Sequence, residues 1–99
     1  MLLIVGTIRF PAENVAAARG AIEALVTATR TEDGCFEYRF AEDVLDPGLI
    51  HITERWCDRA ALDAHFQTPH IAAWRAAGAA LGVSGRALTL YTVDDGQAL

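Results

Sequence analysis

The chain has 99 residues, which is enough for one domain over residues 1–99 and too few for two. Thirteen acidic residues against eight arginines, with no lysine, give a formal charge of −5, which disfavours nucleic acid and anionic membranes as partners. The apolar start has no basic residue before it and no cleavage site, and no segment approaches the length of a membrane span, so we expect a cytoplasmic protein.

The first half of the chain alternates between strand and helix patterns. Residues 2–10 form a β-rich run, and residues 13–30 place apolar side chains at helical spacing before the turn at Asp33-Gly34. Residues 35–42 alternate in polarity, with Phe36, Tyr38 and Phe40 expected on one face, and predict a second strand. A third strand over residues 49–57 follows the turn Asp46-Pro47-Gly48, and we expect it to pair antiparallel with the second.

Two helix starts follow the third strand. Asp58 is a favourable N-cap for a short helix that contains His65. Thr68 and Pro69 then begin a second helix, because threonine caps well and proline is tolerated in the first turn. We expect this helix to run to about Leu81.

The order of elements predicts the fold. Residues 87–93 form a fourth strand, and the tail 94–99 is expected to be loosely held. The order β-α-β-β-α-β is the ferredoxin-like arrangement of an α+β fold, with both helices on one face of the sheet. Because several strands carry apolar residues on both faces, a second copy of the sheet is the simplest cover for the other face, so we expect a homodimer.

Neither the cysteines nor the histidines indicate a metal site. Cys35 and Cys57 are well separated and are expected to be reduced thiols. His51 should face away from the other two histidines, and His65 and His70, five apart across a proline, do not share one regular helical face. No glycine-rich phosphate loop or dinucleotide fingerprint is present, so no metal and no cofactor are expected.

Glu54 and Trp56 lie two apart on the third strand and therefore share a face. A carboxylate on an otherwise apolar face must be paired or lie near water. Glu54 is therefore either a general base with a raised pKa or the partner of a nearby arginine. Trp56 is either a pocket wall that stacks on a planar ligand or a core residue.

Three further side chains allow both a functional and a structural interpretation. His65 is either a neutral imidazole that accepts a proton in a pocket or a buried histidine held by a backbone carbonyl. His70, at the start of a helix, either lines the pocket or caps and packs the helix. Tyr38 either places its hydroxyl in a cavity or belongs to an aromatic core.

The stretch from Glu54 to His70 resembles the antibiotic biosynthesis monooxygenase family, and particularly its bacterial quinol monooxygenase branch. The resemblance rests on Glu-x-Trp at residues 54–56, Ala-His-Phe-Gln-Thr-Pro-His at residues 64–70, and Glu-Asp-Gly-Cys at residues 32–35. It covers nearly the whole chain and implies the dimeric α+β barrel of that family. The His-x-x-Thr-Pro-His pattern also occurs in a related isomerase that acts on phosphorylated autoinducer-2.

The resemblance implies oxidation of a small quinol-like or polyphenolic substrate without a cofactor. His65, aided by Glu54, would deprotonate the phenol in a dry pocket, and the phenolate would pass an electron to dioxygen. Five side chains would line the pocket and hold the ring: Tyr38, Trp56, Phe66, His70 and Trp74. Two alternatives remain open, an isomerase of a small carbonyl metabolite and a non-catalytic dimeric module that binds a small ligand.

Overall fold

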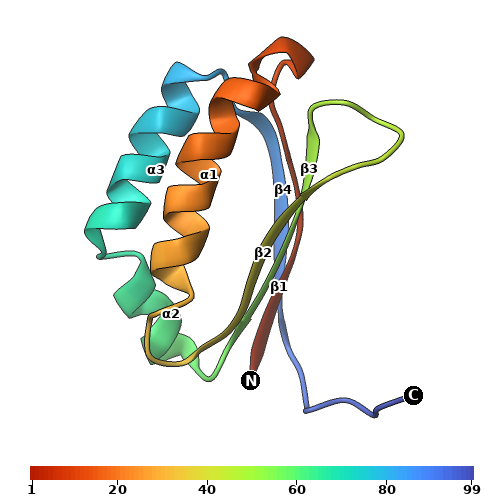
Figure 1. Ribbon diagram of the computed structural model, residues 1–99. Coiled ribbons are helices and arrows are strands. Elements are labelled where there is room, and N and C mark those ends of the chain that lie inside the picture. Colours follow the sequence, from red (N-terminus) through yellow and green to blue (C-terminus); the bar gives the residue numbers. More distant parts are fainter.

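The computed structural model describes all residues from 1 to 99 and contains one four-stranded sheet with a helical layer on one face (Figure 1). The elements in chain order are β1 (Leu2–Arg9), the short 3-10 helix η1 (Ala12–Asn14), α1 (Val15–Thr29), β2 (Cys35–Glu42), β3 (Leu49–Trp56), α2 (Arg59–His65), α3 (Pro69–Ala80) and β4 (Ser84–Thr92). The ferredoxin-like α+β fold predicted from the sequence is therefore confirmed. None of the helices has the length and apolar character needed to cross a membrane.

The sheet has the strand order β2-β3-β1-β4, and all neighbouring strands are antiparallel, including the predicted pair of β2 and β3. Side chains alternate between the two faces. On central β1, Ile4 and Ile8 are buried under the helices, while Leu3 and Val5 point to the open face, where Tyr91 lies opposite Leu3. Figure 1 shows α1 and α3 on one face and no element on the other. The homodimer that would cover this open face stays a prediction.

Side-chain caps define the helix starts that the sequence predicts. The Asp58 carboxylate accepts a hydrogen bond of 2.9 Å from the backbone N–H of Ala61, and the Thr68 hydroxyl accepts one of 3.3 Å from Ile71. Each bond satisfies a backbone donor that the first helical turn leaves free. The Thr68 hydroxyl also donates to the carbonyl of His65 at 2.7 Å, so it fixes the junction between α2 and α3.

Gly34 closes the turn between α1 and β2. Its φ of 80° lies in the left-handed region, and a Cβ at this position would lie 2.7 Å from both the Ala61 Cβ and the Cys57 Sγ. Only glycine therefore fits without displacing a neighbour. This close approach places the turn, including Glu32, against α2.

The aromatic face expected on residues 35–42 is wrong at Phe36. The register of β2 against β3 shifts between Cys35 and Glu37, so Phe36 is the extra residue of a bulge and is 57% exposed. Tyr38, two residues on, is buried. A prediction from alternation alone cannot detect a bulge, because the extra residue moves the side chains that precede it in the strand to the opposite face of the sheet.

The helical layer covers β1, β2 and β3 but leaves β4 open. Every residue of β4 is exposed except Leu88, which is half-buried. β4 also begins at Ser84, three residues before the predicted start. α3 packs closely against α1, and space remains between α3 and this edge strand. The candidate site lies in that space.

Candidate functional site

The α3–β4 cavity, as we name it, has a volume of about 370 Å³ and lies between α3 and the exposed edge of the sheet. This volume is within the range of roughly 300–1,000 Å³ that is typical of small-molecule sites. An adjoining space of about 180 Å³, the α2–β4 hollow, continues it along β4 and shares Glu54, Arg86 and Leu88 with it. Together they form one groove beside β4.

Aromatic side chains form the walls of the α3–β4 cavity. Phe40 and Trp74 meet edge to face with ring centroids 5.5 Å apart, and Tyr38 lies 5.6 Å from Phe40. Ile52, Leu88 and neighbouring apolar side chains complete the lining. Such walls favour a planar, largely apolar ligand because they offer flat surface and exclude water.

Glu54 is the only carboxylate that lines this cavity. It is 6% exposed, and its Oε1 accepts a hydrogen bond of 3.0 Å from the indole N–H of Trp56. No arginine lies within ion-pair distance of this carboxylate, so Glu54 is not the partner of an arginine, and its role as a general base stays a prediction. Burial raises the pKa of Glu54, while the Trp56 bond and the charge of Arg86 oppose the shift.

Tyr38 contributes a neutral hydroxyl beside Glu54. Burial and, after it, the charge of Glu54 raise the pKa of Tyr38, which therefore keeps its proton at all physiological pH values. Its ring lines the α3–β4 cavity. Tyr38 thus belongs to the aromatic core and also borders the cavity, while a place for its hydroxyl inside the cavity stays a prediction.

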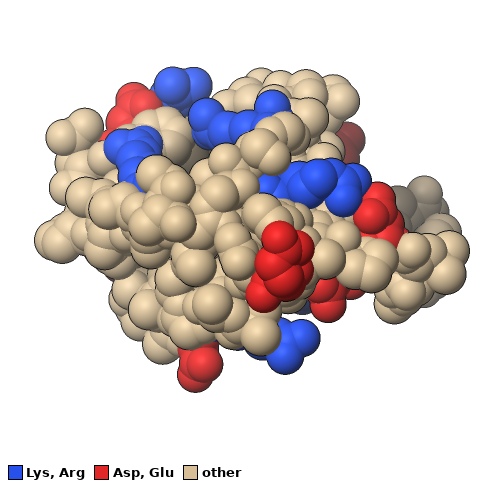
Figure 2. Space-filling model, turned by 90° about the horizontal axis from the view of Figure 1, so that it is seen from above, with Lys and Arg blue, Asp and Glu red and all other residues tan.

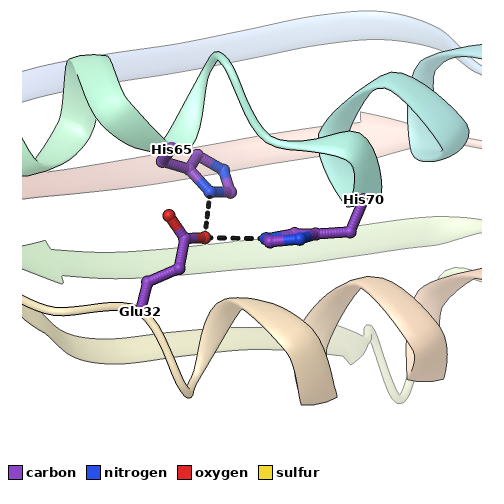
Figure 3. A group of neighbouring side chains, drawn as sticks. All are labelled: Glu32, His65 and His70. Carbon is purple, nitrogen blue, oxygen red and sulfur yellow. Dashed lines mark hydrogen bonds and ion pairs between the residues drawn. The ribbon is translucent and has the colours of Figure 1, made fainter.

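A second polar group lies behind the cavity walls: Glu32, His65 and His70 (Figure 3). One oxygen of Glu32, Oε2, bonds to Nδ1 of His65 at 2.7 Å and to Nε2 of His70 at 2.8 Å. A carboxylate can only accept, so Nδ1 of His65 carries the proton of the neutral ring. Burial lowers the pKa of His65, and the bond to Glu32 offsets part of that shift.

His65 ends α2 and His70 lies in the first turn of α3, so the two do not share one helical face, as expected, and Glu32 joins them from another part of the chain. The three groups hold ligand-type atoms within 4.8 Å of one another, and two imidazoles with one carboxylate are a donor set that divalent metals accept. Both imidazoles bond directly to the same carboxylate oxygen, so we assign the three groups as a hydrogen-bonded network. His51 lies on the open face, as predicted, and bonds to Asp43 at 2.8 Å.

The predicted site residues fall into three places. Tyr38, Glu54 and Trp74 line the α3–β4 cavity, and Phe66 lines the α2–β4 hollow. Three others line neither space: Trp56, His65 and His70. His65 is 1% exposed and packs against Trp56 at 4.9 Å and Tyr38 at 5.4 Å between ring centroids. It can influence the cavity through these two rings.

Sequence reasoning did not find two cavity residues, Arg75 on α3 and Arg86 on β4. Neither has a local signal, because each is a single arginine on an otherwise ordinary helix or strand. Only the packing of α3 beside β4 brings them to one space. Cys35 and Cys57 are both free thiols and line neither the cavity nor the hollow.

The profile of the antibiotic biosynthesis monooxygenase family matches residues 1–77. A solved Deinococcus radiodurans structure assigned to that family is 31% identical, with a TM-score of 0.90 over 100% of this chain and 98% of that one. The structure of Rv0793 from Mycobacterium tuberculosis is 30% identical, with a TM-score of 0.84 over 98% of each chain.

Sequence comparison with curated relatives covers shorter segments. Rv0793 is 42% identical over 60 residues, which are 61% of this chain and 58% of that protein. A Synechocystis protein, sll1783, is 42% identical over 48 residues, which are 48% of this chain and 33% of that protein. The matched segment thus spans little more than half of the first relative and a third of the second.

Proposed function

The chain belongs to the antibiotic biosynthesis monooxygenase family, and from this premise we propose that it oxidises a small quinol-like or polyphenolic substrate with dioxygen and without a bound cofactor. The observation that carries the proposal is the buried Glu54 carboxylate at the base of an aromatic-walled cavity. Such a site can bind a phenol and remove its proton. Deprotonation makes the phenol easier for dioxygen to oxidise.

Binding of the ring is the task of the aromatic walls. A planar quinol can lie against the surface that Trp74 on α3 forms with Tyr38 and Phe40 on β2. Its apolar faces replace water there, and its hydroxyl group points to Glu54. Fixing the reacting groups in one orientation lowers the entropic part of the barrier.

Proton transfer is the task of Glu54. Its Oε1 is held by the Trp56 N–H at 3.0 Å, while Oε2 has no hydrogen-bond partner in the protein and is not fully buried. The free oxygen can therefore accept the phenol proton. A carboxylate with a raised pKa is a stronger base than an ordinary glutamate, which favours general-base catalysis near neutral pH.

The electrons come from the substrate. Deprotonation makes the quinol a stronger reductant, and dioxygen is the oxidant. If two electrons and two protons pass to dioxygen, the products are a quinone and hydrogen peroxide. If one oxygen atom enters the ring, the products are a hydroxyquinone and water, which is the monooxygenase outcome.

His65 has a positioning role in this scheme. It packs against Trp56 and Tyr38 and is tied to Glu32 by its Nδ1–H. This arrangement holds the indole whose N–H orients Glu54. Removing the His65 ring should therefore slow turnover by about tenfold, whereas loss of a general base typically costs roughly a hundredfold or more.

Oxygen uptake tests the proposal. We would supply 1,4-dihydroxynaphthalene and a small panel of other quinols to metal-free and flavin-free protein, subtract spontaneous oxidation, and compare Glu54→Gln and His65→Asn with Glu23→Gln, an exposed control on α1. We expect uptake above the baseline in the wild type and the control, and none with Glu54→Gln. If His65→Asn abolishes uptake and Glu54→Gln does not, His65 is the base.

The same experiment separates the alternative functions. If the wild type does not exceed the baseline with any quinol, the oxidation proposal fails. An isomerase would use the Glu54 carboxylate to move a proton next to a carbonyl, and its turnover would not depend on oxygen. A binding module would retain the ligand without turnover.

A further inference from the structure

All but two of the eight arginines of this protein have an oxygen acceptor as a partner, and those two line the same cavity. Six of them bond to a carboxylate or a backbone carbonyl: Arg9, Arg19, Arg30, Arg39, Arg55 and Arg59. The remaining two, Arg75 and Arg86, have no such partner, and both line the α3–β4 cavity. In the view of Figure 2, some basic side chains lie against acidic ones and others stand apart.

A shortage of carboxylates does not explain this arrangement. Thirteen acidic residues outnumber the eight arginines in the chain, yet none of them lies within ion-pair distance of Arg75 or Arg86. The nearest carboxylate on the cavity lining, Glu54, is buried and bonded to Trp56. Neither guanidinium group therefore forms an ion pair with Glu54, although the rise that burial causes in the pKa of this carboxyl is opposed by the charge of Arg86.

The two arginines lie at the rim of the α3–β4 cavity, whereas most of the cavity interior is apolar. Arg75 and Arg86 are exposed, one on α3 and the other on β4, so they approach the cavity from opposite sides. The interior holds the aromatic walls and Glu54. Arg75 also lies 5.9 Å above the ring of Phe66, which restricts its side chain without using its N–H donors.

Guanidinium groups are suited to one ligand chemistry in particular. Their planar set of N–H donors matches the paired oxygens of carboxylate and phosphate groups. A ligand with an aromatic body and an anionic substituent would therefore satisfy the interior and the rim at the same time.

We propose that Arg75 and Arg86 form an anion subsite at the rim of the α3–β4 cavity, and that the substrate is an aromatic quinol carrying a carboxylate or phosphate group. The aromatic and quinol part of this inference rests on the proposed function, whereas the anion subsite rests on the two arginines. The anion would orient the ring so that its hydroxyl group reaches Glu54. The subsite thus selects both the substrate class and its direction of entry.

Calorimetric titration tests the subsite with ligands that are not hydroquinones. The probes are 1-naphthol, 1-hydroxy-2-naphthoate and 1-naphthyl phosphate, which share a ring system and differ in charge. We expect at least one anion to bind the wild type about tenfold more tightly than 1-naphthol, consistent with charge-assisted hydrogen bonds. The preferred anion identifies the group, and 0.5 M salt should weaken the preference.

Matched variants assign the preference to the two arginines. Arg75→Gln and Arg86→Gln should each reduce it by about threefold, and the double variant should remove it while 1-naphthol binds as before. Arg19→Gln on α1 makes the same charge change at a residue that lines neither the cavity nor the hollow and should leave the preference intact. Unchanged 1-naphthol affinity shows that the cavity of the double variant is still formed.

Three results would overturn the subsite: equal affinity for neutral and anionic probes, no measurable binding of either anion, or a preference that persists in the double variant. Oxygen uptake plays no part in this titration. An anion preference with no oxygen uptake would retain the subsite and reject the proposed oxidation. Oxygen uptake with no anion preference would do the reverse.

Discussion

The hydrogen-bonded network around Glu32 makes a measurable contribution to stability. Replacing Glu32 with alanine removes the acceptor of both the His65 Nδ1–H and the His70 Nε2–H. The His65 side chain is 1% exposed, so water cannot replace the acceptor that its N–H loses, whereas the His70 side chain is 22% exposed and can bond to water. The loss should therefore come mainly from His65.

An unsatisfied buried donor costs about 1–3 kcal/mol, so we expect Glu32→Ala to lower the free energy of unfolding by about 2 kcal/mol. For a domain of this length, the melting temperature should fall by roughly 8–16 °C. Urea denaturation and thermal melting both measure the effect. The control is Asp33→Ala, whose exposed carboxylate makes no hydrogen bond, with an expected change within about 0.5 kcal/mol. Equal stability of the two variants would refute the reasoning.

Three other features make predictions of the same kind. Folding lowers the pKa of His65, so the unfolded chain binds more protons than the folded one and the free energy of unfolding should fall as the pH drops below about 6.5. Urea titrations between pH 5 and 8 measure this dependence, and His65→Asn should flatten it. Gly34→Ala should destabilise the protein by more than about 1 kcal/mol, because the φ of Gly34 is 80° and a Cβ there has no room. Gly20→Ala should stabilise α1 by about 0.5–1 kcal/mol, because a Cβ at this helical position meets nothing within 4 Å. Equal melting temperatures of the two variants would contradict both expectations. If the open face of the sheet pairs two copies, light scattering should give twice the chain mass of 10.7 kDa for the wild type. The helix-surface control Ala16→Asp should also be a dimer, whereas Val5→Asp on the open face should be a monomer. A wild-type monomer would reject the dimer.

Local rules were sufficient for most of the fold. Asp58 and Thr68 are N-caps that act within their own first turns, and the side chains of β3 alternate between a buried and a more exposed face, so both could be predicted from neighbouring residues. The family resemblance seen at residues 54–70 is likewise confirmed. Phe36 was mispredicted because a bulge depends on the register with β3, which no single strand contains.

Only part of the candidate site could be predicted, because the rest likewise depends on contacts between distant segments. Glu54 could be singled out because a carboxylate on an apolar strand face is costly unless it has a partner or a function. Glu32 bridges two histidines only because the turn at Gly34 packs against α2. Arg75 and Arg86 meet at one cavity only because α3 leaves β4 uncovered. These contacts join distant segments and have no pattern in the local sequence.

The pH dependence of oxygen uptake in the wild type and in Glu54→Gln tests most directly whether Glu54 is the base. With a quinol substrate, kcat/KM of the wild type should rise with pH through an apparent pKa above the ordinary glutamate value of 4.5, because burial raises the pKa of Glu54 and only its ionised form can accept the proton. Glu54→Gln should lose this dependence together with at least about 99% of the rate. An unchanged rate and pH profile in Glu54→Gln would contradict the account.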